Sequence, residues 1–269
     1  MIRKLAPHLL KILPDQLGYR LVLSLSGATQ AVPLSEPERQ AMASAKPLRY
    51  GGQNTAWDWG AGPLVILVHG WGGRAAQMAP LAASLATRGY RCVAPDVAGH
   101  GDAKKPYTRW SYFLRDIEAL TRSLGSEVFA FVGHSAGGLT MMAVRRKGRI
   151  ASRRYVCICA PSYPFPPVDR IRQLLDPSDG VMERYKAYLG REFDVPWQAL
   201  EAGDSFAAAG GDVLVIYDER DRFVPHTEGD RIHALCPGST LIKTQGYGHQ
   251  RILAAPELLE HVGDFLGRH

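Results

Sequence analysis

The chain has 269 residues, a formal net charge of +6 and 46% hydrophobic residues. This length fits one or two domains, and α/β folds commonly use it as one. A charged fraction of 22% is ordinary for a globular protein and excludes a disordered chain. The four cysteines show no metal-ligand spacing, so neither a disulfide scaffold nor a metal site is indicated.

The positive charge raises the question of a nucleic-acid partner. Its densest run is Arg145-Arg146-Lys147-Gly148-Arg149, and no aromatic residue interleaves it. The run falls where a helix is expected to end, a place where cations are stabilised in any protein. We therefore expect no nucleic-acid partner. The sequence carries no signal for an oligomeric state.

Residues 1–47 are expected to form a helical N-terminal extension. Pro7, Lys11 and Pro14 interrupt the apolar residues at the start, which does not fit a signal peptide. No stretch reaches the ~20 apolar residues that span a bilayer, so we expect a cytoplasmic protein. Leucines between Leu5 and Leu25 indicate one or two short amphipathic helices packed on the rest of the protein. Peripheral membrane contact through this segment is the less favoured alternative.

From residue 64 onward, short apolar runs alternate with helical segments. This alternation is typical of a parallel sheet with crossover helices. The expected strands are 64–68, 92–94, 128–132, 155–159, 213–217 and 240–243. The expected helices are 75–88, 110–124, 136–146 and 256–266. We therefore predict an α/β core formed by residues 48–160 and 211–269.

Residues 161–210 interrupt the alternation with six prolines. Two helices are expected between them, Val168 to Leu175 and Val181 to Leu189. A structureless connection of this length is uncommon in a compact domain. The segment is therefore interpreted as a helical lid inserted between two core strands.

Gly133-His134-Ser135-Ala136-Gly137 matches the pattern G-x-S-x-G. An apolar strand precedes it and a helix follows it, which disfavours a chance glycine-rich turn. In that context the sharp turn projects the serine above the sheet, beside helix N–H groups that stabilise negative charge. Ser135 is the predicted nucleophile, and His134 is expected to support the turn.

Acyl transfer also needs hydrogen-bond donors for the developing oxyanion. The backbone N–H of Ala136, directly after the nucleophile, is one expected donor. The second is the backbone N–H of Trp71 in His69-Gly70-Trp71-Gly72-Gly73, a glycine-rich loop that follows an expected strand. His69 itself is expected to be a structural hydrogen-bonding residue.

The acid and the base are expected at later strand ends. Two aspartates follow the strand 213–217: Asp218 adjoins it, and Asp221 lies three residues further on. Asp221 is preferred and Asp218 is the alternative. His249 follows the last strand within a glycine-rich loop. The order Ser135, Asp221, His249 is that of a hydrolase triad, in which histidine takes the serine proton and aspartate fixes its tautomer.

On these motifs the chain resembles the α/β-hydrolase superfamily from about Trp57 to the C-terminus. The resemblance implies an eight-stranded, mostly parallel sheet with helices on both faces, a helical lid and no cofactor. It supports Asp221, because the family usually places the acid three residues after a glycine, where this chain has Asp218. The run 95–101 resembles the family's D-x-x-G-H-G turn and is expected to form a rigid loop. Cys157 and Cys159, two apart on one strand, are expected to be core thiols.

The expected function is hydrolysis of a small-molecule carboxylic ester through an acyl-enzyme. Lipase-like, thioesterase, carbon–carbon bond hydrolase and perhydrolase activities use the same triad in related proteins and stay open. Dehalogenase and epoxide-hydrolase activities are disfavoured, because the turn carries Ser135 where those relatives carry aspartate. A ligand-binding homologue without turnover is the rival from another class.

Overall fold

The computed structural model describes residues 13–29, 33–52, 54–101, 107–209 and 212–267. Its centre is one eight-stranded sheet with the strand order β1-β2-β4-β3-β5-β6-β7-β8. The strands are β1 Lys46–Tyr50, β2 Asn54–Gly60, β3 Leu64–Val68, β4 Arg91–Pro95, β5 Val128–His134, β6 Arg154–Ile158, β7 Asp212–Asp218 and β8 Thr240–Thr244. β2 runs antiparallel to both of its neighbours and the remaining pairs are parallel. The predicted mostly parallel α/β sheet is confirmed.

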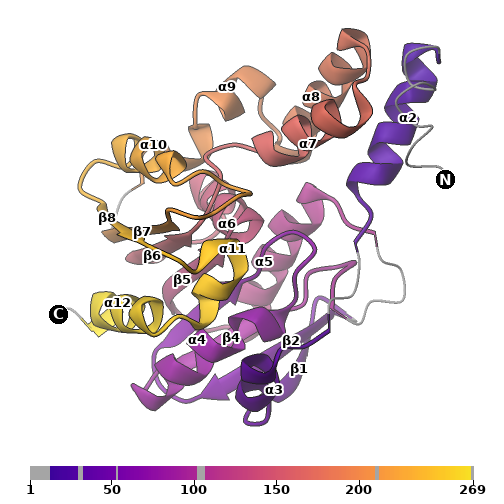
Figure 1. The fold of residues 1–269 in the computed structure, drawn as a ribbon. Coiled ribbons are helices and arrows are strands. Elements are labelled where there is room, and N and C mark those ends of the chain that lie inside the picture. The colour runs from indigo at the N-terminus through magenta and orange to yellow at the C-terminus, as the bar shows by residue number, and fades with distance from the viewer. Residues whose placement is uncertain (1–12, 30–32, 53, 102–106, 210–211, 268–269) are drawn as a thin grey trace.

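Helices cover both faces of this sheet (Figure 1). They are α4 Ala75–Thr87, α5 Trp110–Leu124, α6 Ala136–Arg146, α10 Thr227–Leu235 and α12 Pro256–Gly267. α4 contacts α12 on one face, and α5 contacts α6 on the other. α5 and α6 have the predicted boundaries, because apolar residues recur at helical spacing and Gly125 ends α5 in the left-handed conformation at φ 60°.

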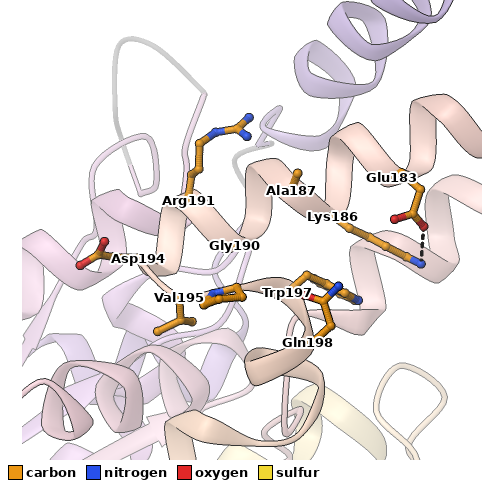
Figure 2. A pocket seen from close by; sticks show the side chains of 10 residues that line it. Glu183, Lys186, Ala187, Gly190, Arg191, Asp194, Val195, Trp197 and Gln198 are labelled. Atoms are coloured by element: carbon orange, nitrogen blue, oxygen red, sulfur yellow. Dashed lines mark hydrogen bonds and ion pairs between the residues drawn. The ribbon is translucent and has the colours of Figure 1, made fainter.

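Three α-helices and a short 3₁₀ helix occupy the insertion between β6 and β7. They are α7 Phe165–Leu175, α8 Asp179–Phe193, α9 Trp197–Glu201 and η1 Asp204–Phe206. The two helices predicted here are present, but both begin earlier, and α8 also ends later. α8 begins one residue after Ser178, whose hydroxyl accepts a hydrogen bond from the N–H of Val181 over 3.2 Å. A cavity of about 510 Å³ lies between α8 and the start of α9, beside Lys186 and Trp197 (Figure 2).

The N-terminal helix α2 Asp15–Ser26 packs against α8 and α7 (Figure 1). The Asp15 carboxylate accepts a hydrogen bond from Ser178 Oγ over 2.6 Å, at the start of α8. A second helix, α3 Glu36–Met42, packs on α4. The part of the expected N-terminal helix before residue 13 lies outside the described residues. No helix in the described ranges is both long enough and apolar enough to cross a bilayer.

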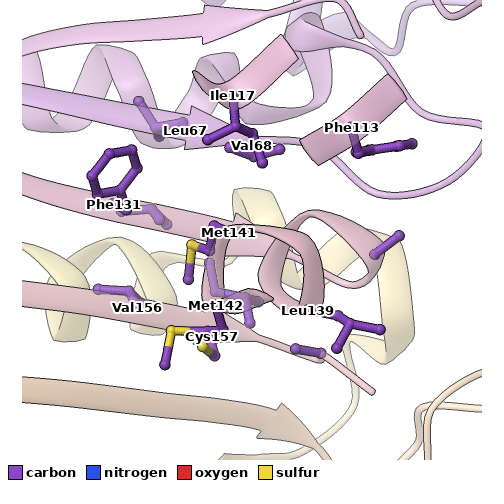
Figure 3. Packing of buried hydrophobic residues seen from close by; sticks show 14 of the residues in the cluster. Leu67, Val68, Phe113, Ile117, Phe131, Leu139, Met141, Met142, Val156 and Cys157 are labelled. Carbon is purple, nitrogen blue, oxygen red and sulfur yellow. The ribbon is translucent and has the colours of Figure 1, made fainter. Parts of the chain in front are cut away.

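The core packs α6 against the central strands. Leu67 of β3, Phe131 of β5 and Val156 of β6 are fully buried, and Met141 and Met142 of α6 lie over them (Figure 3). Burying side chains of this size contributes roughly 1.5–3 kcal/mol each. This packing fixes the start of α6, and with it the turn that carries Ser135.

Candidate active site

Ser135 occupies a strained turn between β5 and α6. Its backbone has φ 51° and ψ −122°, a conformation that costs a residue other than glycine about 1–3 kcal/mol. Its N–H donates to the carbonyl of Ile158 over 2.9 Å. A Cβ atom on Gly133 would lie 2.5 Å from the Cα of Gly138, so strand and helix approach this closely only with glycine. The sequence pattern and the strained geometry therefore describe the same sharp turn.

The loop after β3 lies directly against this turn. A Cβ on Gly70 would be 3.0 Å from the Cβ of Ser135. The Gly73 N–H donates to the Gly70 carbonyl over 3.0 Å, which closes the loop. Within the described part of the chain, the backbone N–H groups of Trp71 and Ala136 have no hydrogen-bond partner. These are the two N–H groups that the sequence predicts as oxyanion donors.

Two neutral imidazoles, those of His69 and His100, form hydrogen bonds to the loop after β3. His69 donates from Nδ1 to the Gly70 carbonyl over 2.8 Å and accepts the Val97 N–H at Nε2 over 3.1 Å. His100 accepts the Gly72 N–H at Nε2 over 3.0 Å. Burial lowers the pKa of His69 to about 4 and that of His100 to about 3, so both stay uncharged near neutral pH. His69 is structural, as the sequence suggested.

Asp221 and His249 form a buried hydrogen-bonded pair. Asp221 Oδ2 lies 2.6 Å from His249 Nδ1, and the side chains are 0% and 11% exposed. Asp221 Oδ1 accepts the N–H groups of Phe223 and Val224 over 2.7 and 2.9 Å. Burial acts to raise the pKa of Asp221, but the hydrogen bonds from His249 and from the Val224 and Phe223 N–H groups outweigh it and hold that pKa below its ordinary value. An ionised carboxylate thus orients the imidazole.

Asp218, the alternative acid, does something else. Its Oδ1 accepts the N–H groups of Arg220 and Gly248, both over 2.9 Å. Its Oδ2 accepts the Tyr247 N–H and the Thr244 hydroxyl, both over 3.0 Å. Burial opposes ionisation, yet these backbone donors lower the pKa of Asp218 below its ordinary value. Asp218 therefore anchors the loop that presents His249, and only Asp221 of the two contacts the imidazole.

His134, the residue before Ser135, lies against the side chain of His249. The His134 and His249 rings have centroids 4.7 Å apart. Among the described residues, the Ser135 hydroxyl makes no hydrogen bond to His249. In sites without substrate this contact is often long and shortens when substrate binds. All three predicted residues lie at the carboxyl ends of β5, β7 and β8, where a parallel sheet gathers its functional loops.

Cys157 and Cys159 are both fully buried core thiols, as expected, but Cys159 does not lie on the strand with Cys157. It lies one residue beyond β6 with φ 48°, so the strand alternation ends before it. Its buried Sγ, an Asp221 oxygen and a His249 nitrogen lie within 4.8 Å of one another. Burial, and then the charge of Asp221, raise the pKa of this thiol, which keeps it protonated and a poor metal ligand.

Phe223 is the other neighbour of His249 that the sequence reasoning missed. Its ring centroid lies 5.2 Å from that of His249, and 67% of its surface is exposed. Its position two residues after Asp221, in the loop that holds the acid, is the signal that identifies it in the sequence. The cavity beside α8 and α9 is lined by none of these site residues.

Comparison with known proteins assigns the family. A model of the alpha/beta hydrolase family matches residues 65–262, which is more than half of the chain. The chain therefore belongs to the α/β-hydrolase family.

Curated relatives with several activities match parts of the chain. Epoxide hydrolase 2 from Siraitia grosvenorii is 28% identical over 193 residues, which cover 64% of this chain and 55% of that protein. Fluoroacetate dehalogenase from Burkholderia sp is 32% identical over 120 residues, covering 41% of this chain and 39% of that protein. The matches to the first such relatives cover from 24% to 55% of those proteins.

Solved structures share the fold at low sequence identity. Bromoperoxidase from Bacillus anthracis superimposes with a TM-score of 0.65 at 18% identity, over 83% of this chain and 100% of that one. A thermophilic esterase from Thermogutta terrifontis gives a TM-score of 0.59 at 17% identity, over 82% and 97% of the two chains. These likenesses establish the architecture and leave the reaction to the site residues.

Proposed function

We propose that this protein is a serine hydrolase that cleaves carboxylic esters of small molecules through an acyl-enzyme. The observation that carries the proposal is the 2.6 Å hydrogen bond between Asp221 and His249, formed beside a strained serine turn. Two unpartnered N–H groups, at Trp71 and Ala136, supply the donors that acyl transfer requires.

The proposed reaction has two halves. His249 takes the proton of Ser135 as the hydroxyl oxygen attacks the ester carbonyl, and Asp221 stabilises the imidazolium that forms. The Trp71 and Ala136 N–H groups bind the oxyanion. His249 then gives the proton to the leaving alcohol, and the acyl group stays on Ser135. Water, activated by His249, attacks the acyl-enzyme and releases the acid.

The names of the relatives suggest epoxide-hydrolase and dehalogenase chemistry as well. The turn of this chain carries a serine and not an aspartate, which favours acyl transfer to Ser135 over those reactions. Thioester, carbon–carbon bond and peracid chemistry would use the same three side chains. An ester panel extended with acyl thioesters therefore belongs in the first test.

The test is hydrolysis of p-nitrophenyl esters by the full chain and by Ser135→Ala. We expect Ser135→Ala to lose at least about 10³-fold in kcat, since residual catalysis in such sites comes only from binding and the oxyanion donors. Ser44→Ala is the matched control, because that hydroxyl lies at the surface and donates to the Ala41 carbonyl over 3.3 Å. Stoichiometric labelling by a fluorophosphonate, lost in Ser135→Ala, is also expected. Full activity of Ser135→Ala, or an unreactive native chain, would refute the proposal.

Two further expectations from the sequence stay predictions. Residues 161–210 are proposed to act as a lid, which limited proteolysis with and without a covalent phosphonate would test through altered cleavage in α7 or α8. The cytoplasmic location is tested by fractionation of cells that produce the protein.

A further inference from the structure

Phe223 is a large apolar side chain left in solvent at the edge of the candidate active site. It is 67% exposed, more than Leu17, Leu25 and Leu174, the other large exposed hydrophobics of the described chain. Those three lie on α2 and α7, whereas Phe223 lies against His249 at 5.2 Å between ring centroids. Leaving an aromatic ring in water is unfavourable, and a ligand group that packs on the ring removes that apolar surface from water.

The loop fixes the backbone that carries this ring. The Phe223 N–H donates to Asp221 Oδ1 over 2.7 Å, and the next residue, Val224, is 1% exposed. The backbone that fixes the acid thus also fixes the Cα from which the ring projects. An aromatic side chain carried on a rigid backbone loses little conformational freedom when a ligand stacks on it.

The position of Phe223 beside His249 determines which half of an ester substrate its ring can contact. In the proposed reaction His249 protonates the leaving oxygen, so the group attached to that oxygen lies next to the imidazole. The carbonyl oxygen points the other way, toward the N–H groups of Trp71 and Ala136. A ring in contact with His249 is therefore within reach of the leaving alcohol.

We propose that Phe223 makes the enzyme selective for esters whose leaving alcohol is aromatic or bulky and apolar. This inference rests on the proposed esterase function and adds a substrate class to it. The ring of Phe223 stacks on the leaving group in the complex that precedes acylation. Once the alcohol has left, Phe223 has no contact with the acyl-enzyme, so the selectivity belongs to kcat/KM and not to deacylation.

Three esters test this with the aromatic ring on either side of the carbonyl. Benzyl acetate places a phenyl ring on the leaving alcohol, ethyl phenylacetate places it on the acyl group, and ethyl acetate has none. Benzyl alcohol and ethanol are similar in acidity, so the comparison reports binding. We expect Phe223→Ala to reduce the benzyl acetate to ethyl acetate ratio of kcat/KM about tenfold, the size expected for one aromatic contact. The ethyl phenylacetate to ethyl acetate ratio should not change.

Two variants separate this role from a structural one. Phe223→Tyr keeps the ring and should keep the ratio, and Leu17→Ala removes another exposed apolar side chain, on α2, and should change nothing. An equal loss on all three esters in Phe223→Ala, or a change confined to ethyl phenylacetate, would overturn the inference. If the native chain hydrolyses none of the three and resists fluorophosphonate, the proposed function itself has failed. Hydrolysis with an unchanged benzyl ratio rejects the Phe223 inference alone.

Discussion

The side chain of His134 donates a hydrogen bond from Nε2 to the backbone carbonyl of His249 over 2.8 Å. Burial, assisted by the nearby His249, lowers the pKa of His134 to about 3, so the imidazole is neutral and keeps one donor and one acceptor. The residue before the nucleophile thus binds the residue that carries the proposed base. This hydrogen bond connects the serine turn to the loop after β8.

Replacing His134 tests whether this contact positions His249. Gln can place an amide N–H close to the position of the imidazole Nε2, whereas Asn is too short. We expect His134→Asn to lower kcat about 10- to 100-fold with little change in KM. A misplaced general base stabilises the transition state less and leaves substrate binding unchanged. His134→Gln should recover most of the loss. Steady-state kinetics of both purified variants checks this, and equal losses in the two would contradict it.

Asp221→Asn should inactivate without unfolding. The amide no longer stabilises the imidazolium and favours the wrong histidine tautomer, which in a triad costs about 10³- to 10⁴-fold in kcat. The measurement is the pre-steady-state rate of p-nitrophenol release, with thermal unfolding recorded alongside. If Asp221→Asn kept kcat within tenfold of the native value, another group would have to orient His249.

Asp218→Asn should act mainly on stability. It replaces a fully buried carboxylate that accepts four hydrogen bonds, and leaving such donors poorly paired costs about 2–4 kcal/mol. Because the pKa of Asp218 is lowered on folding, its stabilisation is complete above the ordinary value of 3.8 and is lost as the pH falls toward the lower folded value. Urea unfolding at pH 7 and at pH 3.5 measures the free energy of unfolding of both proteins. The difference between the native protein and the variant should be smaller at pH 3.5. A difference that is larger there would be inconsistent with this role.

Three buried histidines also make the folding stability depend on pH, in a higher pH range than the one set by Asp218. The pKa values of His69, His100 and His134 fall from 6.5 to about 4, 3 and 3 through burial, so unfolding lets each bind a proton. Stability is therefore complete above pH 6.5 and falls as the pH drops below it. At pH 5.5 each histidine lowers the free energy of unfolding by about 1.4 kcal/mol relative to pH 7.5, and the three together lower it by about 4 kcal/mol.

Urea unfolding across this pH range measures the effect. His100→Gln removes one titrating group and offers an amide oxygen to the Gly72 N–H, so its pH slope should be shallower by about one third. A native chain with equal stability at pH 7.5 and 5.5 would show that these imidazoles are already accessible to protons.

The sequence predicts the fold where the physics is local. α5 and α6 match their predicted ranges because helical apolar spacing and a glycine stop are encoded within a dozen residues. β1 and β2 were not predicted, because they carry half-exposed polar residues and lack an apolar run. β2 is placed by its pairing with β4 and β1 by its pairing with β2, and no local pattern shows either pairing.

The same limit applies to the candidate site. Ser135 and His249 stand in motifs, so their positions are visible in the chain. The choice between Asp218 and Asp221 depends on which carboxylate meets the imidazole and which meets backbone N–H groups, and that is a tertiary contact. Cys159 is a core thiol as expected, but its contact with the Asp221 and His249 side chains is also tertiary, because its own left-handed backbone ends the strand alternation that places it beside Cys157.

Gly70 provides the sharpest test of the oxyanion loop. Its φ is not in the left-handed region, so alanine is permitted by the backbone, yet the added Cβ would lie 3.0 Å from Ser135 Cβ and 3.1 Å from His134 Nδ1. The loop must therefore shift by a few tenths of an ångström, which moves the Trp71 N–H away from the oxyanion. We expect Gly70→Ala to lower kcat about 10- to 10³-fold, with KM little affected, since that donor acts in the transition state.

Gly267→Ala is the matched control, because a Cβ there meets no atom within 4 Å. It should leave both kcat and unfolding unchanged. The Gly70→Ala protein should also keep its native melting temperature within about 3 °C, because the loop moves only slightly and no core contact is lost. If Gly70→Ala instead raised KM and left kcat intact, the loop would bind the ground state and the oxyanion donors would have to lie elsewhere.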